Sequence, residues 1–195
     1  MPISVSLSWS LATVLATTLP AQLVVVRPLP WPTPPPLQRS EWQPPRPSER
    51  HVWVGGHFAP EGDRLVWRAG RWTIPPEPRL RYEPARWDDR GGRFVFLRGH
   101  FRPISPASPD RPYDPPSLTA STRAPVVPPP APIEQHDAPP FPGAVWIAGW
   151  WWYDGIDFLW VAGRWSAAPT GQTWLPPRWI PETSGARFEP GRWQP

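Results

Sequence analysis

Few residues of this 195-residue chain combine the types and the spacing that a reaction centre needs. His57 and His100 occupy the same position in two related segments, and they could share a metal ion if those segments met. No third ligand has a fixed spacing to them, so we expect surface histidines. The chain has no cysteine, no phosphate-binding glycine loop, and no zinc-protease or hydrolase motif. The sequence therefore predicts no catalytic residue, no cofactor or metal site, and a protein that is not an enzyme.

Acidic residues are the other candidates for chemistry, since two carboxylates across a cleft could hydrolyse glycosides. Four aspartates stand near sequences that form turns, and they are Asp88, Asp89, Asp154 and Asp157. Aspartate favours turns because its side chain accepts hydrogen bonds from the nearby backbone. We therefore expect these residues to shape turns, and nothing in the sequence brings two of them together in a cleft.

The dominant feature is a repeat in which two aromatic residues flank a glycine, as aromatic-x-x-Gly-x-aromatic. Eight copies occur, and they begin at Trp53, Trp67, Tyr82, Phe96, Trp146, Trp160, Trp174 and Phe188. The middle position is glycine in six copies and is Ala85 or Pro177 in the other two. The copies start 14 or 15 residues apart within two sets of four, and the sets are offset by 92 or 93 residues. We infer that a block of four units was duplicated whole.

The residues around each copy favour β-structure. Segments such as 52–54, 65–67 and 158–161 consist of β-branched, aliphatic and aromatic residues, and turn-forming residues separate them. A strand of eight or nine residues plus a tight turn accounts for the 14-residue period. We therefore predict an all-β fold, in which residues 51–102 and 144–195 each form a four-stranded antiparallel meander. We expect the two blocks to pack together as a sandwich or a closed eight-stranded arrangement, and independent folding is the alternative.

The spacing of the two aromatics within a copy raises a question of geometry. Side chains alternate along a regular strand, so residues five apart lie on opposite faces. Either a bulge near the glycine returns both rings to one face, or both faces of each sheet carry rings. The glycine also leaves a slot in which a ring from the neighbouring strand can lie against the backbone. This slot explains why glycine and aromatic residues recur together.

Proline marks the segments between the predicted blocks. The chain contains 36 prolines, which concentrate outside the repeats. Residues 22–50 and 103–143 are therefore predicted to be disordered proline-rich linkers. Residues 1–21 carry no charged side chain, are largely apolar and end at Leu19-Pro20-Ala21, which is typical of a cleaved export signal. An uncleaved membrane anchor is the alternative, and no membrane span is expected once the signal is removed.

Two groups of side chains are candidates for contact with a partner. The first is a run of four rings, Trp150, Trp151, Trp152 and Tyr153. These rings cannot all point inward from one strand, so at least one is expected to be exposed unless both faces are covered. The second group is the row of arginines that precede the second aromatic, represented by Arg71, Arg164 and Arg192. We expect these arginines to form a solvated face, in which guanidinium groups stack on rings of adjacent strands.

The copies at residues 67–72, 146–151 and 160–165 resemble the WXXGXW repeat family, also written YXWGXW. The resemblance covers both blocks, and the chain departs from the pattern at Ala85, at Pro177 and at several phenylalanines. Proteins of that family are bacterial and usually exported. The resemblance therefore implies a location in the bacterial periplasm or at the cell surface, and it implies no activity or catalytic residue.

These patterns lead to two hypotheses for function. The first is a non-enzymatic structural or interaction module of the cell envelope, whose arginine face meets an unknown protein or cell-wall component. The second is a carbohydrate- or peptidoglycan-binding module that uses exposed tryptophan platforms. The regular spacing of tryptophan and glycine favours the first. Single-stranded nucleic acid could bind to arginines and rings, but export would separate the protein from it, so no nucleic-acid partner is expected.

Overall fold

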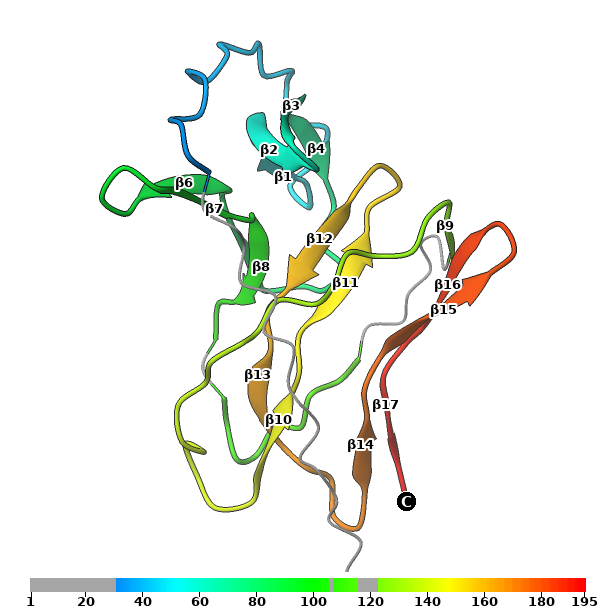
Figure 1. The fold of residues 1–195 in the computed structure, drawn as a ribbon. Coiled ribbons are helices and arrows are strands. Elements are labelled where there is room, and N and C mark those ends of the chain that lie inside the picture. The colour runs from blue at the N-terminus through cyan, green and yellow to red at the C-terminus, as the bar shows by residue number, and fades with distance from the viewer. Residues whose placement is uncertain (1–30, 106, 116–122) are drawn as a thin grey trace, which may run out of the picture.

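The computed structural model describes residues 31–105, 107–115 and 123–195, and it contains no helix within these ranges. The predicted signal segment 1–21 lies outside the described residues, as do parts of both proline-rich segments. Over the described ranges, no helix could cross a membrane. The all-β fold class is confirmed, and the strands form several small sheets, most of them antiparallel (Figure 1).

The building unit is a kinked hairpin made from two consecutive copies of the repeat. In the first hairpin, β1 (Val52–Val54) and β2 (His57–Glu61) lead to the turn, and β3 (Arg64–Arg68) and β4 (Arg71–Thr73) return from it. β1 pairs with β4 and β2 pairs with β3, both antiparallel. The strand is interrupted at the middle position of each copy, which is glycine in both copies of this hairpin. The two rings of a copy therefore belong to different strands. Neither of the two geometries considered from sequence, a bulge or one continuous regular strand, applies.

Three further hairpins follow the same plan, with the outer strands paired to each other and the inner strands paired to each other. The second hairpin consists of β5 (Leu80–Glu83), β6 (Arg86–Asp89), β7 (Phe94–Leu97) and β8 (His100–Pro103). The third consists of β10 (Ala144–Ile147), β11 (Trp150–Tyr153), β12 (Phe158–Val161) and β13 (Arg164–Ala167). The fourth consists of β14 (Thr173–Leu175), β15 (Arg178–Glu182), β16 (Gly185–Glu189) and β17 (Arg192–Gln194).

The sixteen aromatics of the template pair with one another across the hairpins. In the first hairpin, Trp53 lies opposite Trp72 with ring centroids 5.3 Å apart, and Phe58 lies opposite Trp67 at 5.0 Å. The equivalent pairs are Tyr82–Phe101, Trp87–Phe96, Trp146–Trp165, Trp151–Trp160, Trp174–Trp193 and Trp179–Phe188. The rings meet edge-to-face or tilted, an arrangement that contributes about 0.5–1.5 kcal/mol per pair beyond burial. The repeat therefore places every template ring opposite another ring.

The template glycines leave room for these rings, which confirms the predicted slot. A Cβ atom at Gly56 would lie 2.5 Å from Cζ2 of Trp67, and one at Gly149 would lie 2.5 Å from Cζ2 of Trp160. Side chains that begin a copy also cover the other four glycines, which are Gly70, Gly99, Gly163 and Gly191. At Ala85, where alanine replaces the glycine, the facing ring is the smaller ring of phenylalanine. Ala85 and Phe96 lie in one apolar cluster.

Gly56 and its neighbour Gly55 provide a matched test of the slot. Neither residue has the left-handed backbone conformation, and the atom nearest to a Cβ at Gly55 would be 3.8 Å away. We expect Gly56→Ala to lower the free energy of unfolding by about 1–3 kcal/mol, because both the Trp67 ring and the Glu41 carboxylate that lies against this glycine must move. Gly55→Ala should leave stability unchanged or raise it slightly. Chemical denaturation of the full chain measures both, and equal effects of the two substitutions would contradict the slot.

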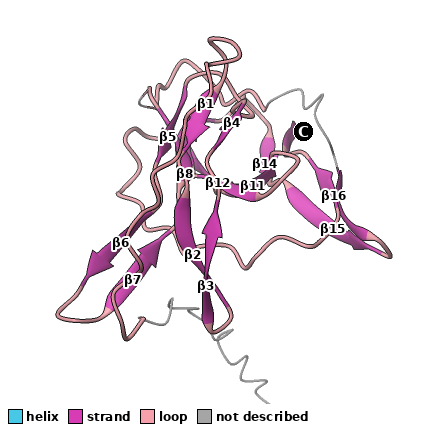
Figure 2. Cartoon of the chain, turned by 90° about the horizontal axis from the view of Figure 1, so that it is seen from above, coloured by secondary structure: helices cyan, strands magenta, loops and turns pink. Residues whose placement is uncertain are grey.

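The hairpins do not continue into two four-stranded meanders. Strand β8 of the second hairpin instead pairs in parallel with β12 of the third, giving a sheet in the order β11-β12-β8-β5. The kink in the middle of each copy turns the inner strands away from the outer ones, so that the inner pairs β2–β3, β6–β7 and β15–β16, which carry the turns, diverge from one another (Figure 2). For the same reason the described residues form no closed eight-stranded arrangement.

The main core lies where the two blocks meet, which confirms that they pack on each other. One apolar cluster combines buried residues of both blocks, namely Val54, Leu80, Phe101, Trp150, Trp152, Leu159, Val161 and Phe188. Phe101 and Val161 face each other across the β8–β12 pairing and are completely buried. Burial of one such side chain contributes about 1.5–3 kcal/mol, so the junction between the blocks is a major source of stability.

Parts of the proline-rich segments also belong to the folded structure. Trp31 forms two backbone hydrogen bonds with Phe94 of β7, with N···O distances of 2.7 and 2.9 Å. In the second block, β9 (Arg123–Ala124) pairs with β16, and Ala124 lies opposite Ala186. Ala124 follows Trp31 by 93 residues and Ala186 follows Phe94 by 92, which are the offsets of the blocks. The duplicated unit therefore begins before its first hairpin, and the described parts of 22–50 and 103–143 are not merely disordered linkers.

Candidate functional site

Two glutamates from the proline-rich segments bind the kinks of the first and third hairpins. The Glu134 carboxylate accepts hydrogen bonds from the backbone N–H groups of Gly149 and Gly163, at 2.8 and 2.7 Å, and from the indole N–H of Trp160 at 3.0 Å. Glu41 is equivalent. It accepts from the N–H of Gly70 at 3.0 Å and from the indole N–H of Trp67 at 3.1 Å. We call each of these arrangements a glutamate clip.

Within the described ranges, the clips occur in the hairpins whose sequence supplies the donors. The first and third hairpins have glycine in the odd copy and a tryptophan at the start of the even copy. The second hairpin has Ala85 and Phe96 at these positions, and the fourth has Pro177 and Phe188. Phenylalanine has no indole N–H, so this donor to a carboxylate is missing in both hairpins, and Pro177 also lacks a backbone N–H. Sequence reasoning missed Glu41 and Glu134, although their 93-residue separation matches the offset of the blocks.

Two equivalent arginines join the blocks through buried ion pairs. Nε of Arg71 lies 2.8 Å from Oδ2 of Asp154, and the two side chains are 13% and 1% exposed. Arg164 binds Glu77 through two hydrogen bonds of 2.8 and 3.2 Å. Each pair links an arginine of one block to an acid of the other. Arg71 and Arg164 therefore do not lie on a solvated face, whereas Arg192 is exposed as predicted.

The run of four rings at residues 150–153 is enclosed on both faces. Trp150, Trp151 and Trp152 are each only 5–6% exposed, and Tyr153 is half-buried. The Trp150 ring stacks on Phe188 at 5.1 Å, while Trp151 meets Trp160 at 5.0 Å. None of the three tryptophans is exposed, which is the outcome that the sequence allowed only for a strand covered on both faces. The physical reason is that other hairpins cover the faces of β11 that a lone sheet would leave open.

Three of the four aspartates shape turns as the sequence predicts, whereas Asp88 lies within β6 and pairs with Arg86. Oδ1 of Asp89 accepts a hydrogen bond from the N–H of Gly92 at 2.8 Å, and Oδ1 of Asp154 accepts from the N–H groups of Ile156 and Asp157 at 3.0 and 2.9 Å. His57 and His100 each form a hydrogen bond between Nδ1 and a nearby backbone carbonyl. No group of three possible metal ligands occurs in the described part of the chain.

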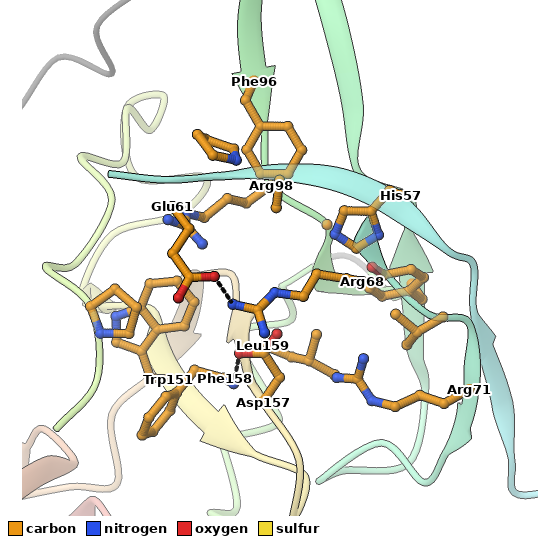
Figure 3. A pocket seen from close by; sticks show the side chains of 16 residues that line it. His57, Glu61, Arg68, Arg71, Phe96, Arg98, Trp151, Asp157, Phe158 and Leu159 are labelled. Atoms are coloured by element: carbon orange, nitrogen blue, oxygen red, sulfur yellow. Dashed lines mark hydrogen bonds and ion pairs between the residues drawn. The ribbon is translucent and has the colours of Figure 1, made fainter. Parts of the chain in front are cut away.

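A pocket of about 210 Å³ lies between the first, second and third hairpins. Its charged lining consists of Arg68, Arg71, Arg98, Glu61 and Asp157, and rings of Tyr82, Phe96, Trp151 and Phe158 complete the wall. Figure 3 shows Arg68 beside Glu61, to which its Nη2 donates a hydrogen bond of 3.1 Å. Three guanidinium groups from two hairpins thus converge on one space, and the pocket exists only because the blocks are packed together.

Burial and charge shift two ionisable groups at this pocket. Burial raises the pKa of Tyr82 to about 12, and the charges of Asp154 and Asp157 add to the rise against the opposing effect of Arg71. Burial also lowers the pKa of Arg98, and the positive charge of Arg68 acts in the same direction, against the opposing effect of Asp157. Arg68 and Arg98 are nevertheless exposed to solvent, whereas Arg71 is largely buried, so it is the charge of Arg71 that interacts more strongly than in water.

The raised pKa of Tyr82 predicts a loss of stability in alkali. A tyrosine in the unfolded chain ionises near pH 10, whereas folded Tyr82 keeps its proton until about pH 12. Between these values the unfolded state releases the proton first. The stabilisation that the buried, neutral Tyr82 provides is therefore complete below pH 10 and is lost as pH rises to 12. We expect Tyr82→Phe to flatten the pH dependence of unfolding by denaturant between about pH 9 and 11.5. An unchanged slope would contradict the burial of the phenol.

Comparisons with known proteins add no functional assignment to this geometry. No family model matches the sequence, and no curated protein or solved structure matches it significantly. The function is therefore inferred from the sites of the molecule itself.

A second and larger groove, about 1,330 Å³ in volume, lies beside the third hairpin. The rings of Trp146, Trp165 and Tyr113 line it, together with prolines and several charged residues. His136 lies against Trp146 with ring centroids 4.3 Å apart. At its wall, the Tyr113 hydroxyl donates a hydrogen bond of 2.7 Å to Glu77, the partner of Arg164. The groove offers an extended surface that combines aromatic, proline and charged side chains.

Proposed function

We propose that this protein is a non-enzymatic structural and interaction module of the bacterial cell envelope. The observation that carries the proposal is the pairing of all sixteen template aromatics across the hairpins. A feature repeated this regularly and used inside the fold serves architecture rather than a reaction. The ion pairs between the blocks support the same interpretation, because Arg71 and Arg164 act as internal connections.

The larger groove is the surface that we assign to the partner. An interface core typically contains aromatic residues surrounded by a polar rim, and this groove has both. Its rim includes Arg102, Asp110 and Arg111, which are exposed. The partner is then a protein or a cell-wall component that presents both apolar and charged groups.

The envelope location rests on sequence. The repeat resembles the WXXGXW family, whose members are usually exported, and the apolar N-terminal segment has the character of an export signal. Fractionation of cells that produce the full chain tests this location. Recovery in the cytoplasm with an intact N-terminus would contradict it.

Site-specific photo-crosslinking in living cells tests the interaction. A crosslinking amino acid at Asp110, on the rim of the groove, should give one discrete adduct with an envelope component. The matched control is Asp63, which lies in the turn of the first hairpin with a side chain that is 96% exposed. The proposal fails if neither position gives an adduct or if both give the same adducts.

Carbohydrate binding is the second candidate, and the presence of Trp146 and Trp165 in the groove favours it. Aromatic rings in a groove that also carries charged side chains can stack on sugar faces, which the buried Trp150–Trp152 run cannot do. Soluble peptidoglycan fragments should then compete with the crosslink at Asp110 and shift the tryptophan fluorescence. A protein partner would leave both signals unaffected by the fragments.

A further inference from the structure

We propose that β17 in the fourth hairpin accepts an extended strand of a partner protein on its open edge, in the parallel orientation. The inference does not depend on the proposed function, because β17 contributes no residue to the large groove. It rests on a pairing that the duplicated structure already forms once, between β8 of the second hairpin and β12 of the third.

β17 is the counterpart of β8, from which an offset of 92 residues separates it. In the second hairpin Phe101 of β8 lies opposite Tyr82, and in the fourth hairpin Trp193 of β17 lies opposite Trp174. The register between the paired outer strands is thus the same in both hairpins. The backbone groups that β8 presents on its far edge are therefore presented by β17 at the equivalent positions.

The far edge of β8 is occupied, whereas that of β17 is open. β8 pairs in parallel with β12, and the C=O of Phe101 accepts a hydrogen bond of 2.8 Å from the N–H of Ala162. In the described ranges β17 has β14 as its single neighbour, and Figure 1 shows it at the margin of the molecule. An unpaired strand edge is a template for a further strand, which is how many proteins bind extended segments of a partner.

The exposure of the two strands differs in the same way. Phe101 is completely buried at the junction, whereas β17 contains no buried residue, and its Trp193 is half-buried at the position that corresponds to Phe101. A strand added to β17 would cover more of Trp193, and the removal of apolar surface from water favours association.

The partner has to supply little more than the strand. At the internal junction the third hairpin also provides Asp154, which binds the buried Arg71. Arg164 is the counterpart of Arg71, and it already has Glu77 as its acid. Pairing at β17 therefore requires no acidic residue from the partner for this arginine.

The internal junction also indicates which partner sequence fits. There an aromatic and then an aliphatic residue of β12 lie beside His100 and Phe101, whose counterparts are Arg192 and Trp193. The partner strand should therefore place an aromatic ring beside Arg192, whose guanidinium group can stack on it, and an aliphatic residue beside Trp193. A second copy of this chain would offer β3 for this role. Because β3 has Arg68 at the aliphatic position, a different protein is the better occupant.

A peptide with the sequence of residues 157–164, which includes β12, is the probe for this edge. When it is added to the full nitrogen-15-labelled chain, the backbone amide signals of Arg192, Trp193 and Gln194 should shift to saturation, while those of β8 stay unchanged. Arg192→Gln should weaken the binding about two- to fivefold, because no guanidinium group then stacks on the tryptophan of the peptide. The matched control is Arg90→Gln, which changes an exposed arginine in the turn of the second hairpin and should bind like the unchanged chain.

Two methylated peptides test whether the contact is a strand pairing. A methyl group on the backbone nitrogen of Ala162 removes the N–H that would bind the C=O of Trp193, so the dissociation constant should rise about tenfold or more. The backbone nitrogen of Val161 lies on the opposite edge of the peptide strand, and a methyl group there should leave binding nearly unchanged.

Absence of saturable shifts in β17, or equal binding by the two methylated peptides, would overturn the proposal. Concentration-dependent shifts of the same amides in the chain alone would show that a second copy occupies the edge. That result would overturn the assignment of the edge to a different protein.

Discussion

Asp154→Ala will lower the free energy of unfolding by about 3–5 kcal/mol, the largest loss expected for any single charged residue here. The substitution leaves the Arg71 guanidinium buried at 13% exposure without its carboxylate. It also removes the acceptor for the N–H groups of Ile156 and Asp157 in the turn. Because Arg71 and Asp154 belong to different blocks, the loss should appear as one cooperative shift in the unfolding of the whole chain by denaturant.

Two further variants separate the charge from the turn. Asp154→Asn keeps an oxygen that can accept from the turn while it removes the charge, so its loss should be smaller than that of alanine. Asp88→Ala breaks the surface pair with Arg86, whose side chain is 63% exposed, and should cost no more than about 1 kcal/mol. If Asp154→Ala is no more harmful than Asp88→Ala, the buried pair does not hold the blocks together.

Glu134→Ala will lower the free energy of unfolding by about 3 kcal/mol. Three donors lose their acceptor, namely the N–H groups of Gly149 and Gly163 and the indole N–H of Trp160. Each unsatisfied donor costs about 1–3 kcal/mol, and water that enters the half-buried site will offset part of the sum. Denaturant unfolding followed by tryptophan fluorescence measures the loss, and the indole N–H resonance of Trp160 should move in the same variant.

The duplicated clip supplies the matched comparison. Glu41→Ala should have a smaller effect, because Glu41 is exposed and water can replace its carboxylate. Glu134→Gln should be intermediate, since one amide oxygen replaces two carboxylate oxygens. Glu182→Ala removes a carboxylate bound to surface arginines and should cost at most about 1 kcal/mol. Equal losses for Glu41→Ala and Glu134→Ala would show that burial of the clip has no influence.

The local structure was predictable from sequence because the residue types of the repeat have direct structural consequences. The template predicts β-strands, and the glycine slots for rings such as Trp67 over Gly56 follow from the absence of a side chain. Which strands pair with one another was harder to predict from the sequence. Whether Phe58 pairs with Trp67 inside a hairpin or with a later copy depends on the direction the chain takes after each glycine, and no residue type specifies that direction.

The glutamate clips show where compositional reasoning fails. Segments rich in proline bury little apolar surface, so their composition predicts linkers. Glu41 and Glu134 nevertheless fix these segments through hydrogen bonds to backbone donors that become available only after the hairpins fold. The 93-residue offset, extended upstream of Trp53, aligns the two glutamates with each other, so the sequence does contain a signal for them.

No local sequence pattern predicts the pocket or the buried ion pairs between the blocks. Arg71 and Asp154 are 83 residues apart, and Arg164 and Glu77 are 87 apart. The spacing of arginine before an aromatic predicts a row on one face. It does not reveal that the other block covers that face, which is why all three arginines were expected in solvent and, of the three, Arg192 is there.

The parallel contact between β8 and β12 joins the last strand of the first block to the first hairpin of the second block. The same contact between two molecules would join the second block of one to the first block of the next, head to tail. The strands that would form such a contact between molecules are β17 and β3, the counterparts of β8 and β12. At the internal junction the facing residues are Phe101 and Val161, both fully buried, and their counterparts are Trp193 and Arg68. A guanidinium group at the position of Val161 would have to lose its water in an intermolecular copy of this junction. Arg68 thus opposes fibre growth and favours an assembly that ends at two repeats.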